Sequence, residues 1–212
     1  LQRGIVRTVI AAGGLAIALK KADDETFEIG LAKDESQKIH IPPSRIDQAR
    51  RMLQLGRKNG VEFVLPVDFV MADGSVSPTI PRDGAQFDVG PKTCEQHVAA
   101  VSAFIEYHKK KVGAGQGPAC AFHNGVFGKF EEEPFSQGTR KFIGQLKRLH
   151  DAGAEVYVGG GEGGTALYRY GDESWVTHCF TAGGTILKAL GTEPIPYIKA
   201  LYLKVRRGLR GT

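Results

Sequence analysis

The chain has 212 residues, of which 42% are hydrophobic and 24% are charged, and its formal net charge is +5. These proportions are ordinary for a folded domain and exclude a disordered or fibrous class. Lysines and arginines are interspersed with acids, which disfavours a nucleic-acid partner. No apolar run approaches the roughly 20 residues that span a bilayer. The three cysteines are widely separated, which argues against a zinc site or a disulfide framework.

Six apolar runs predict β-strands, and three segments with helical spacing of apolar residues predict helices. The strands are expected within 6–12, 61–72, 85–90, 118–125, 155–160 and 175–184, and the helices within 44–60, 93–111 and 136–153. The polar, turn-rich segments 22–43 and 73–84 are interpreted as surface excursions. The alternation predicts an α/β fold, a three-layer α/β/α Rossmann-like domain with a six-stranded mainly parallel sheet. We expect a single domain over 1–212, with a basic C-terminal tail from about 197.

Three predicted strands lead through glycines into a helical pattern. These corners are VIAAGGLAIAL at 9–19, VYVGGGEGGTAL at 156–167 and HCFTAGGTILKAL at 178–190. In open parallel sheets, ligands sit outside the carboxyl ends of the strands, where helix N-termini bind anions and glycine permits close approach. The pattern therefore favours a groove for a phosphorylated ligand. Glycine as a filler of tight turns remains the alternative.

The second corner also fits the dinucleotide pattern G-x-G-x-x-G. That pattern requires an acid about 20 residues further on, to hold a ribose hydroxyl. The corresponding stretch here is CFTAGGTIL, which has no acid. The sequence therefore argues against dinucleotide binding of the Rossmann type.

Six segments, taken together and in order, resemble the C-terminal, nucleotide-binding lobe of the phosphoglycerate kinase family over nearly the whole chain. They are VIAAGGLAIALKK, KNGVEFVLPVDFVMAD, FDVGPKT, FHNGVFGKFEEEPFSQGTR, VGGGEGGTA and FTAGGTIL. The resemblance implies phosphoryl transfer between 1,3-bisphosphoglycerate and ADP, with Mg-ADP or Mg-ATP as the nucleotide. Such a reaction relies on positioning and charge neutralisation. The resemblance also implies a cytoplasmic protein.

Site residues follow from the resemblance alone. Glu131 would accept hydrogen bonds from the ribose hydroxyls, although it also reads as a solvated loop acid. Glu162 would replace the aspartate that helps to place Mg²⁺. The remaining positions would act mainly through their main chain: Gly13 and Gly14 below the adenine, Asn124 and Gly125 over the triphosphate, Gly160, Gly161 and Gly163 beside Glu162, and Gly183 and Gly184 as catalytic donors to the transferred phosphoryl group.

Several positions depart from the family pattern. Glu162 adds a methylene where Mg²⁺ demands strict geometry, and Phe180 stands for a small serine, so that its ring is expected to occlude the corner. The family's N-terminal lobe and its G-G-A-K segment have no counterpart, so we expect this chain alone to be inactive. Two interpretations remain open: a nucleotide-binding lobe completed by an N-terminal lobe or a partner chain, or a catalytically inactive kinase-derived scaffold subunit of a larger assembly.

Overall fold

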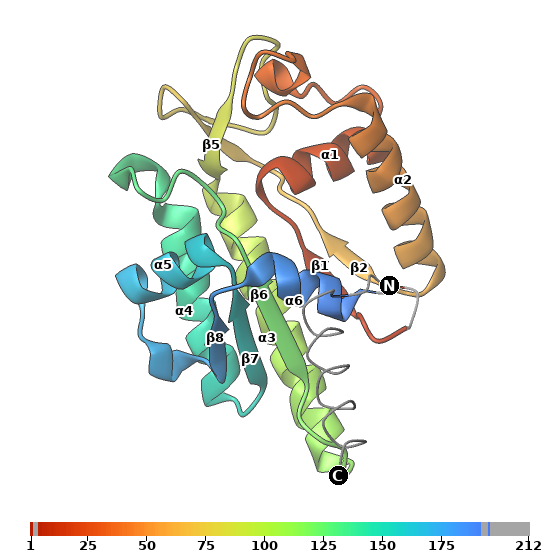
Figure 1. Cartoon of the computed structure of the whole chain (residues 1–212), viewed down its shortest axis with the longest axis vertical. Helices are drawn as coiled ribbons and strands as arrows, with labels where there is room; N and C mark the ends of the chain where they lie inside the picture. Colours follow the sequence, from red (N-terminus) through yellow and green to blue (C-terminus); the bar gives the residue numbers. More distant parts are fainter. Residues whose placement is uncertain (2–3, 192–194, 196–212) are drawn as a thin grey trace, which may run out of the picture.

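The structure of the chain, a computed structural model, describes Leu1, residues 4–191 and Ile195 (Figure 1). The predicted basic tail from about 197 lies outside the described residues. The helices are α1 (Gly13–Asp23), α2 (Pro43–Lys58), α3 (Pro91–Gly113), α4 (Gln137–Asp151), α5 (Gly161–Tyr170) and α6 (Gly183–Leu190). The strands are β1 (Thr8–Ile10), β2 (Glu62–Val64), β3 (Phe69–Met71), β4 (Val76–Ser77), β5 (Gln86–Val89), β6 (Cys120–Asn124), β7 (Glu155–Gly159) and β8 (His178–Phe180). Short 3-10 turns occupy Gly30–Lys33, Glu133–Phe135 and Glu173–Trp175.

The predicted elements are confirmed in kind and place. Each apolar run contains a strand, and the run 61–72 contains two, β2 and β3, because Pro66 lies between them and cannot donate to a ladder. The three predicted helices are α2, α3 and α4, and the glycine corners begin α1, α5 and α6. The α/β class is therefore confirmed. Among the described residues, no helix combines the length and hydrophobicity that crossing a bilayer requires.

The predicted six-stranded sheet is wrong. The parallel strands form two separate sheets, β1-β2 and β6-β7-β8, and the third sheet, β4-β3-β5, is antiparallel. The chain turns back on itself after β3 through Gly74, whose φ of +83° suits a tight turn. This hairpin leads into β5, which pairs antiparallel with β3 and so does not join either parallel sheet.

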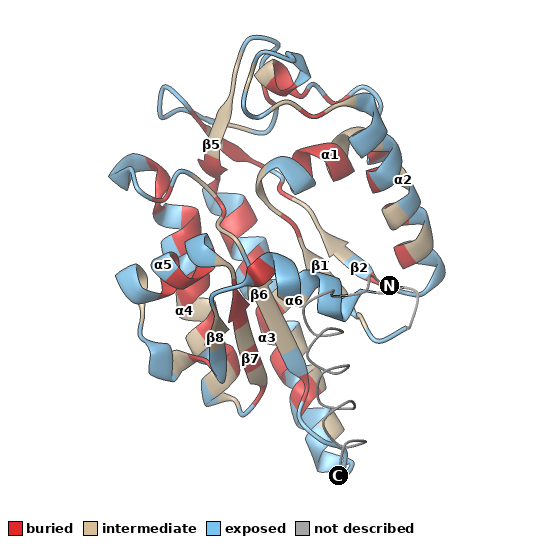
Figure 2. Cartoon of the chain, in the orientation of Figure 1, coloured by how far each residue is buried: buried red, intermediate tan, exposed pale blue. Residues whose placement is uncertain are grey.

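Two hydrophobic clusters form the core. The first joins α1 and α2 to β3 through residues such as Leu19, Leu53 and Phe69. The second lies between α3, α4, α5 and β7, where Val156 and Val158 are 0% exposed. Alternation along β7 turns these two valines toward the helices and leaves Tyr157 half-buried on the other face. Figure 2 shows this distribution, with the buried faces of α4 and α5 turned inward.

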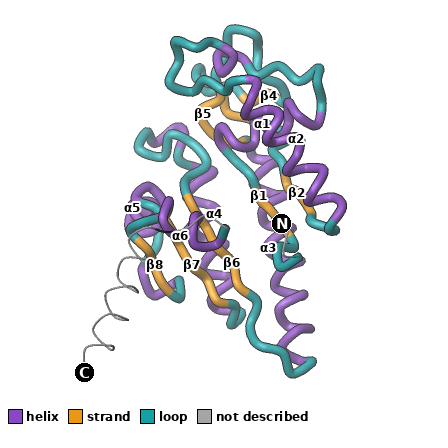
Figure 3. The backbone as a smooth tube through the Cα atoms, turned by 45° about the vertical axis from the view of Figure 1, so that its right-hand side comes forward, coloured by secondary structure: helices purple, strands orange, loops and turns teal. Residues whose placement is uncertain are grey.

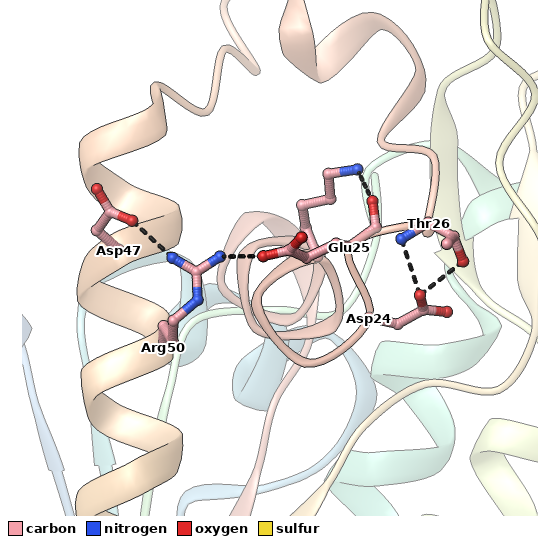
Figure 4. A network of polar contacts seen from close by, with 6 residues as sticks. Asp24, Glu25, Thr26, Asp47 and Arg50 are labelled. Atoms are coloured by element: carbon pink, nitrogen blue, oxygen red, sulfur yellow. Dashed lines mark hydrogen bonds and ion pairs between the residues drawn. The ribbon is translucent and has the colours of Figure 1, made fainter.

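Polar contacts on the surface join α2 to the end of α1 (Figure 4). The Arg50 guanidinium donates to Asp47 at 2.7 Å and to Glu25 at 3.3 Å. Asp24 accepts hydrogen bonds from the amide and hydroxyl of Thr26, which closes the end of α1. Because exposed ion pairs contribute only about 0–1 kcal/mol, the apolar cluster supplies most of the packing energy between the two helices.

Candidate functional site

The chain segments that follow β6, β7 and β8 meet at one corner of the molecule. A Cβ at Gly183 would lie 2.5 Å from the amide nitrogen of Gly160 and would also meet the Oδ1 of Asn124. A Cβ at Gly160 would lie 3.3 Å from the same Asn124 oxygen. The Gly160 amide also donates to the carbonyl of Phe180 at 3.1 Å. We call this meeting point of Asn124, Gly160 and Gly183 the convergent corner.

Glycine is required at the convergent corner for two reasons. Gly125 and Gly160 have φ values of +101° and +88°, in the left-handed region that other residues rarely adopt. Gly183 is required because the main chain of Gly160 passes too close for any side chain. The first turn of α5 also borders the corner, since a Cβ at Gly163 would lie 3.5 Å from the Gly125 nitrogen.

Both helices that begin here start without a side-chain cap. Within the described part of the chain, the first amides of the two helices have no acceptor: Gly161, Glu162 and Gly163 in α5, and Gly183 and Gly184 in α6. A helix N-terminus carries roughly half a positive charge and free N–H donors. The convergent corner therefore presents amides from two helices to an anion.

The corner that leads into α1 stands apart from the other two. Gly13 has a φ of +57° and begins an uncapped helix, as the sequence predicts. A Cβ at Gly13 or Gly14 would meet no atom within 4 Å. The corner belongs to the β1-β2 sheet, and among the described residues no strand pairing joins this sheet to the β6-β7-β8 sheet of the convergent corner. Two of the three predicted glycine corners are thus brought together, along with Asn124 and Gly125.

Glu131 lies at the far end of α5 from the convergent corner. Its carbonyl oxygen accepts from both terminal nitrogens of Arg169, in the last turn of the helix, at 3.4 Å. Its carboxylate is exposed, and the hydrogen bonds of Glu131 to other described residues involve its main-chain oxygen alone. The side chain is therefore free to accept from a ligand that extends along α5.

Glu162 is an exposed acid in the first turn of α5. The described residues include no group of three or more His, Cys, Asp or Glu side chains that could hold a metal ion. Mg²⁺ in nucleotide sites commonly uses one or two carboxylates, with phosphates and water completing its shell. The single carboxylate of Glu162 fits an ion carried by nucleotide phosphates, and does not fit an all-protein metal site.

Phe180 packs its ring on the face of the β6-β7-β8 sheet. The ring stacks on Tyr157 with a centroid distance of 6.1 Å and meets His178 edge-on at 4.4 Å. Its carbonyl holds the Gly160 amide, so the residue supports the convergent corner through its main chain. Occlusion of the corner by the ring stays a prediction.

Asp88, which the sequence analysis missed, supports the loop between β6 and α4. It is completely buried on β5, and its carboxylate accepts from the amides of Gly138 at 2.7 Å and Val89 at 2.8 Å. Burial raises the pKa of this carboxyl to about 6. Gly128 and Gly138 both lie against it too closely for a side chain. In the sequence, this residue is marked only by its place in the segment FDVGPKT, which resembles the phosphoglycerate kinase family.

Two histidines lie in the core beneath this loop. His97 of α3 and His123 of β6 both pack against Phe127 and Phe142, with centroid distances of 4.9–6.1 Å. Desolvation lowers the pKa of each imidazole to about 4. Both rings are therefore neutral at physiological pH, and their role is to pack the core.

A cavity of about 650 Å³ lies elsewhere. It is bounded by α1, β2 and α3, with Lys20, Phe63 and Ala100 among its lining residues. Desolvation lowers the pKa of Lys20, against the raising effect of Asp24 and Asp23, and its ammonium donates to the Pro66 carbonyl at 2.8 Å. None of the predicted site residues lines this cavity.

Comparison with known proteins identifies the family. The family model described as "Phosphoglycerate kinase" matches residues 3–193. The phosphoglycerate kinase of Treponema pallidum (strain Nichols) is 33% identical over 202 residues, which cover 91% of this chain and 43% of the relative. Phosphoglycerate kinase 1 of Pongo abelii is 29% identical over 208 residues, covering 92% and 44%.

The solved structure of phosphoglycerate kinase from Coxiella burnetii superposes with a TM-score of 0.71 at 26% identity. It covers 95% of this chain and 47% of that protein. The chain thus spans less than half the length of these relatives. With a family match over nearly its whole length and a shared fold, the chain belongs to the phosphoglycerate kinase family.

Proposed function

We propose that this chain is the C-terminal, nucleotide-binding lobe of a phosphoglycerate kinase-type enzyme, and that it holds the phosphates of ADP or ATP at the convergent corner. The observation that carries the proposal is the meeting of Asn124, Gly160 and Gly183 at the start of two uncapped helices. Family membership supplies the ligand class. The free amides supply the chemistry that a phosphate requires.

Each predicted residue has a task in this arrangement. The amides of Gly161 and Gly163 donate to the nucleotide phosphates, and those of Gly183 and Gly184 to the transferred phosphoryl group. Hydrogen bonds to charged groups contribute about 1.5–3 kcal/mol each, so several amides together suffice for millimolar affinity or better. Glu131 would hold the ribose and Gly13 and Gly14 would lie below the adenine, as the resemblance implies.

Magnesium, when bound with the nucleotide, neutralises phosphate charge during phosphoryl transfer. Glu162 is the residue of this chain that would hold it. Transfer between 1,3-bisphosphoglycerate and ADP also requires the second substrate to be held opposite the corner. That task falls to an N-terminal lobe or to a partner chain, so we expect no turnover from this chain by itself.

Calorimetric titration with ADP, with and without Mg²⁺, tests the proposal. We expect saturable heat at millimolar ADP and tighter binding in the presence of Mg²⁺. Glu162→Gln should remove the gain from Mg²⁺, because the amide cannot replace a carboxylate ligand, and binding without the metal should persist. The matched control is Glu95→Gln on the exposed surface of α3. Absence of heat from the parent chain would refute the proposal and leave the inactive scaffold as the remaining interpretation.

A further inference from the structure

The loop between β6 and α4, residues 125–136, connects two parts of the proposed nucleotide site. It begins at the convergent corner with Gly125 and carries Glu131, the predicted ribose acid, near its middle. Figures 1 and 3 both show this loop beside the end of β5. We call it the site loop. Its position sets the distance between the amides that face the phosphates and the carboxylate that faces the ribose.

Main-chain hydrogen bonds hold the site loop against two other elements. The Phe127 amide donates to the Thr139 hydroxyl at 3.1 Å, and the Lys129 amide donates to the Phe87 carbonyl at 2.8 Å. Thr139 belongs to the first turn of α4, and Phe87 belongs to β5. The site loop is therefore placed by the way in which β5 and the start of α4 lie relative to each other.

Asp88 joins these two supports. Its carboxylate accepts from the Gly138 amide in the first turn of α4 at 2.7 Å, and from the Val89 amide of β5 at 2.8 Å. Helix α4 has no side-chain cap from its own N-cap residue, so this carboxylate takes the place of a cap. The site loop passes against the same group, since a Cβ at Gly128 would lie 2.6 Å from Oδ1 of Asp88.

The charge of Asp88 decides how well it serves both amides. An ionised carboxylate only accepts hydrogen bonds, whereas a protonated carboxyl also carries an O–H donor. Oδ2 accepts from Gly138 and Oδ1 accepts from Val89. A proton on either oxygen weakens that oxygen as an acceptor and brings a donor close to a main-chain N–H. Protonation therefore weakens the contact between β5 and α4 that places the site loop.

Asp88 titrates close to neutral pH. Burial raises its pKa to about 6, against the lowering effect of the two amides and of Lys141. Other charged or titratable groups surround it on α3, α4, β6, the site loop and the turn before β3: Cys94, His97, Lys141, His123, Lys129 and Asp68. Burial raises the pKa of the Cys94 thiol and lowers the pKa of both imidazoles to about 4. These three groups are therefore neutral between pH 5 and 7.

We infer that Asp88 is a positioning residue for the nucleotide: its ionised carboxylate holds the site loop where the phosphate amides and Glu131 can act on one ligand. The inference rests on the proposed function and adds a form of regulation to it. Because Asp88 is completely buried, it acts through the loop and not by contact with the ligand. Nucleotide affinity should be full above pH 6 and should decrease as the pH falls through 6, because protonation removes the acceptor that α4 requires.

Isothermal titration with Mg-ADP at pH 7 and pH 5 tests the inference on the parent chain and on Asp88→Asn. Loss of one hydrogen bond to a charged group weakens binding about tenfold, so the uncharged variant should bind about tenfold more weakly than the parent at pH 7. At pH 5 the parent is mostly protonated, and the two affinities should agree within about twofold. Protonation of ADP itself affects both proteins equally and cancels in their ratio.

The matched control is Asp151→Asn at the other end of α4, where the exposed carboxylate pairs with Lys147. Its affinity should equal that of the parent at both pH values. A second measurement, on the parent chain alone, covers the case in which Asp88→Asn does not fold. The chemical shift of the Gly138 amide follows the charge of the carboxylate that it contacts. We expect its midpoint near pH 6 without ligand and about one pH unit lower with saturating Mg-ADP, because the coupling is reciprocal.

The outcomes separate the inference from the proposed function. Equal affinity of Asp88→Asn and the parent at pH 7 would overturn the inference alone. An affinity ratio that is the same at both pH values would do so too, because it indicates a structural role without coupling to the proton. A Gly138 midpoint that Mg-ADP does not move would have the same meaning. A parent chain that binds no Mg-ADP at pH 7 would refute the proposed function, and the inference with it.

Discussion

Replacement of Gly183 by alanine tests the geometry of the convergent corner. The new Cβ would lie 2.5 Å from the amide nitrogen and 2.6 Å from the Cα of Gly160, whereas ordinary contacts begin at 3.4 Å. The two loops must therefore separate by roughly 1 Å. Overpacking of this kind costs about 1–3 kcal/mol, which lowers the Tm of a chain of this length by roughly 2–12 °C.

The same displacement moves the first amides of α6 away from a bound phosphate. We expect the affinity for Mg-ADP to fall by about tenfold or more, the equivalent of one charge-assisted hydrogen bond. Differential scanning calorimetry measures the Tm, and isothermal titration measures the affinity.

The matched control is Gly144→Ala in the middle of α4, where a Cβ would meet no atom within 4 Å. This change should raise stability by up to about 1 kcal/mol and leave the affinity unaltered. If Gly183→Ala matched this control in both measurements, the loops would not converge as described.

Three further predictions concern the packing and the titration of single groups. His97 has its pKa lowered from 6.5 to about 4, so its neutral form stabilises the fold above pH 6.5 and this contribution, about 3 kcal/mol, is lost as the pH falls through 4. His97→Phe should reduce the loss of urea-unfolding stability between pH 6.5 and 4, while His123, whose pKa is lowered in the same way, keeps its own share of that loss. An unchanged pH dependence would contradict the reasoning. Gly138→Ala places a Cβ against the Asp88 carboxylate and 2.5 Å from Val89 Cγ2, so we expect a loss of about 1–3 kcal/mol by urea unfolding. Stability equal to that of the parent would show that the first turn of α4 can shift to make room for the methyl group. Phe180→Ser should raise ADP affinity if the ring occludes the corner, at the expense of its stacking on Tyr157, and unchanged affinity would exclude occlusion.

Local patterns were sufficient to predict the helices and strands of this fold other than β4, which lies in the segment 73–84. The apolar spacing in 44–60 predicted α2 because residues such as Ala49 and Leu53 repeat on one face and become buried. The glycine corners were equally visible, since left-handed conformations such as that of Gly160 leave a direct mark on the sequence. These features depend on neighbours along the chain.

Features that depend on distant parts of the chain were missed. The division of the parallel strands into two sheets has no local signal. The residues of β1 and β6 both predict a β-strand, but they do not show which strand each one pairs with. The antiparallel pairing of β5 followed from the hairpin before it, which had been interpreted as a surface excursion. Asp88 was not singled out from the sequence, because its contact with the amide of Gly138, 50 residues further along the chain, arises only in the folded structure.

Amide chemical shifts report most directly on whether the convergent corner binds a nucleotide phosphate. Heteronuclear NMR spectra of the isotopically labelled chain are recorded during titration with ADP. We predict saturable shifts at Gly161, Gly163 and Gly183, with no change at Gly144 in α4. Shifts confined to the cavity around Lys20 and Phe63, or none at millimolar ADP, would contradict the account.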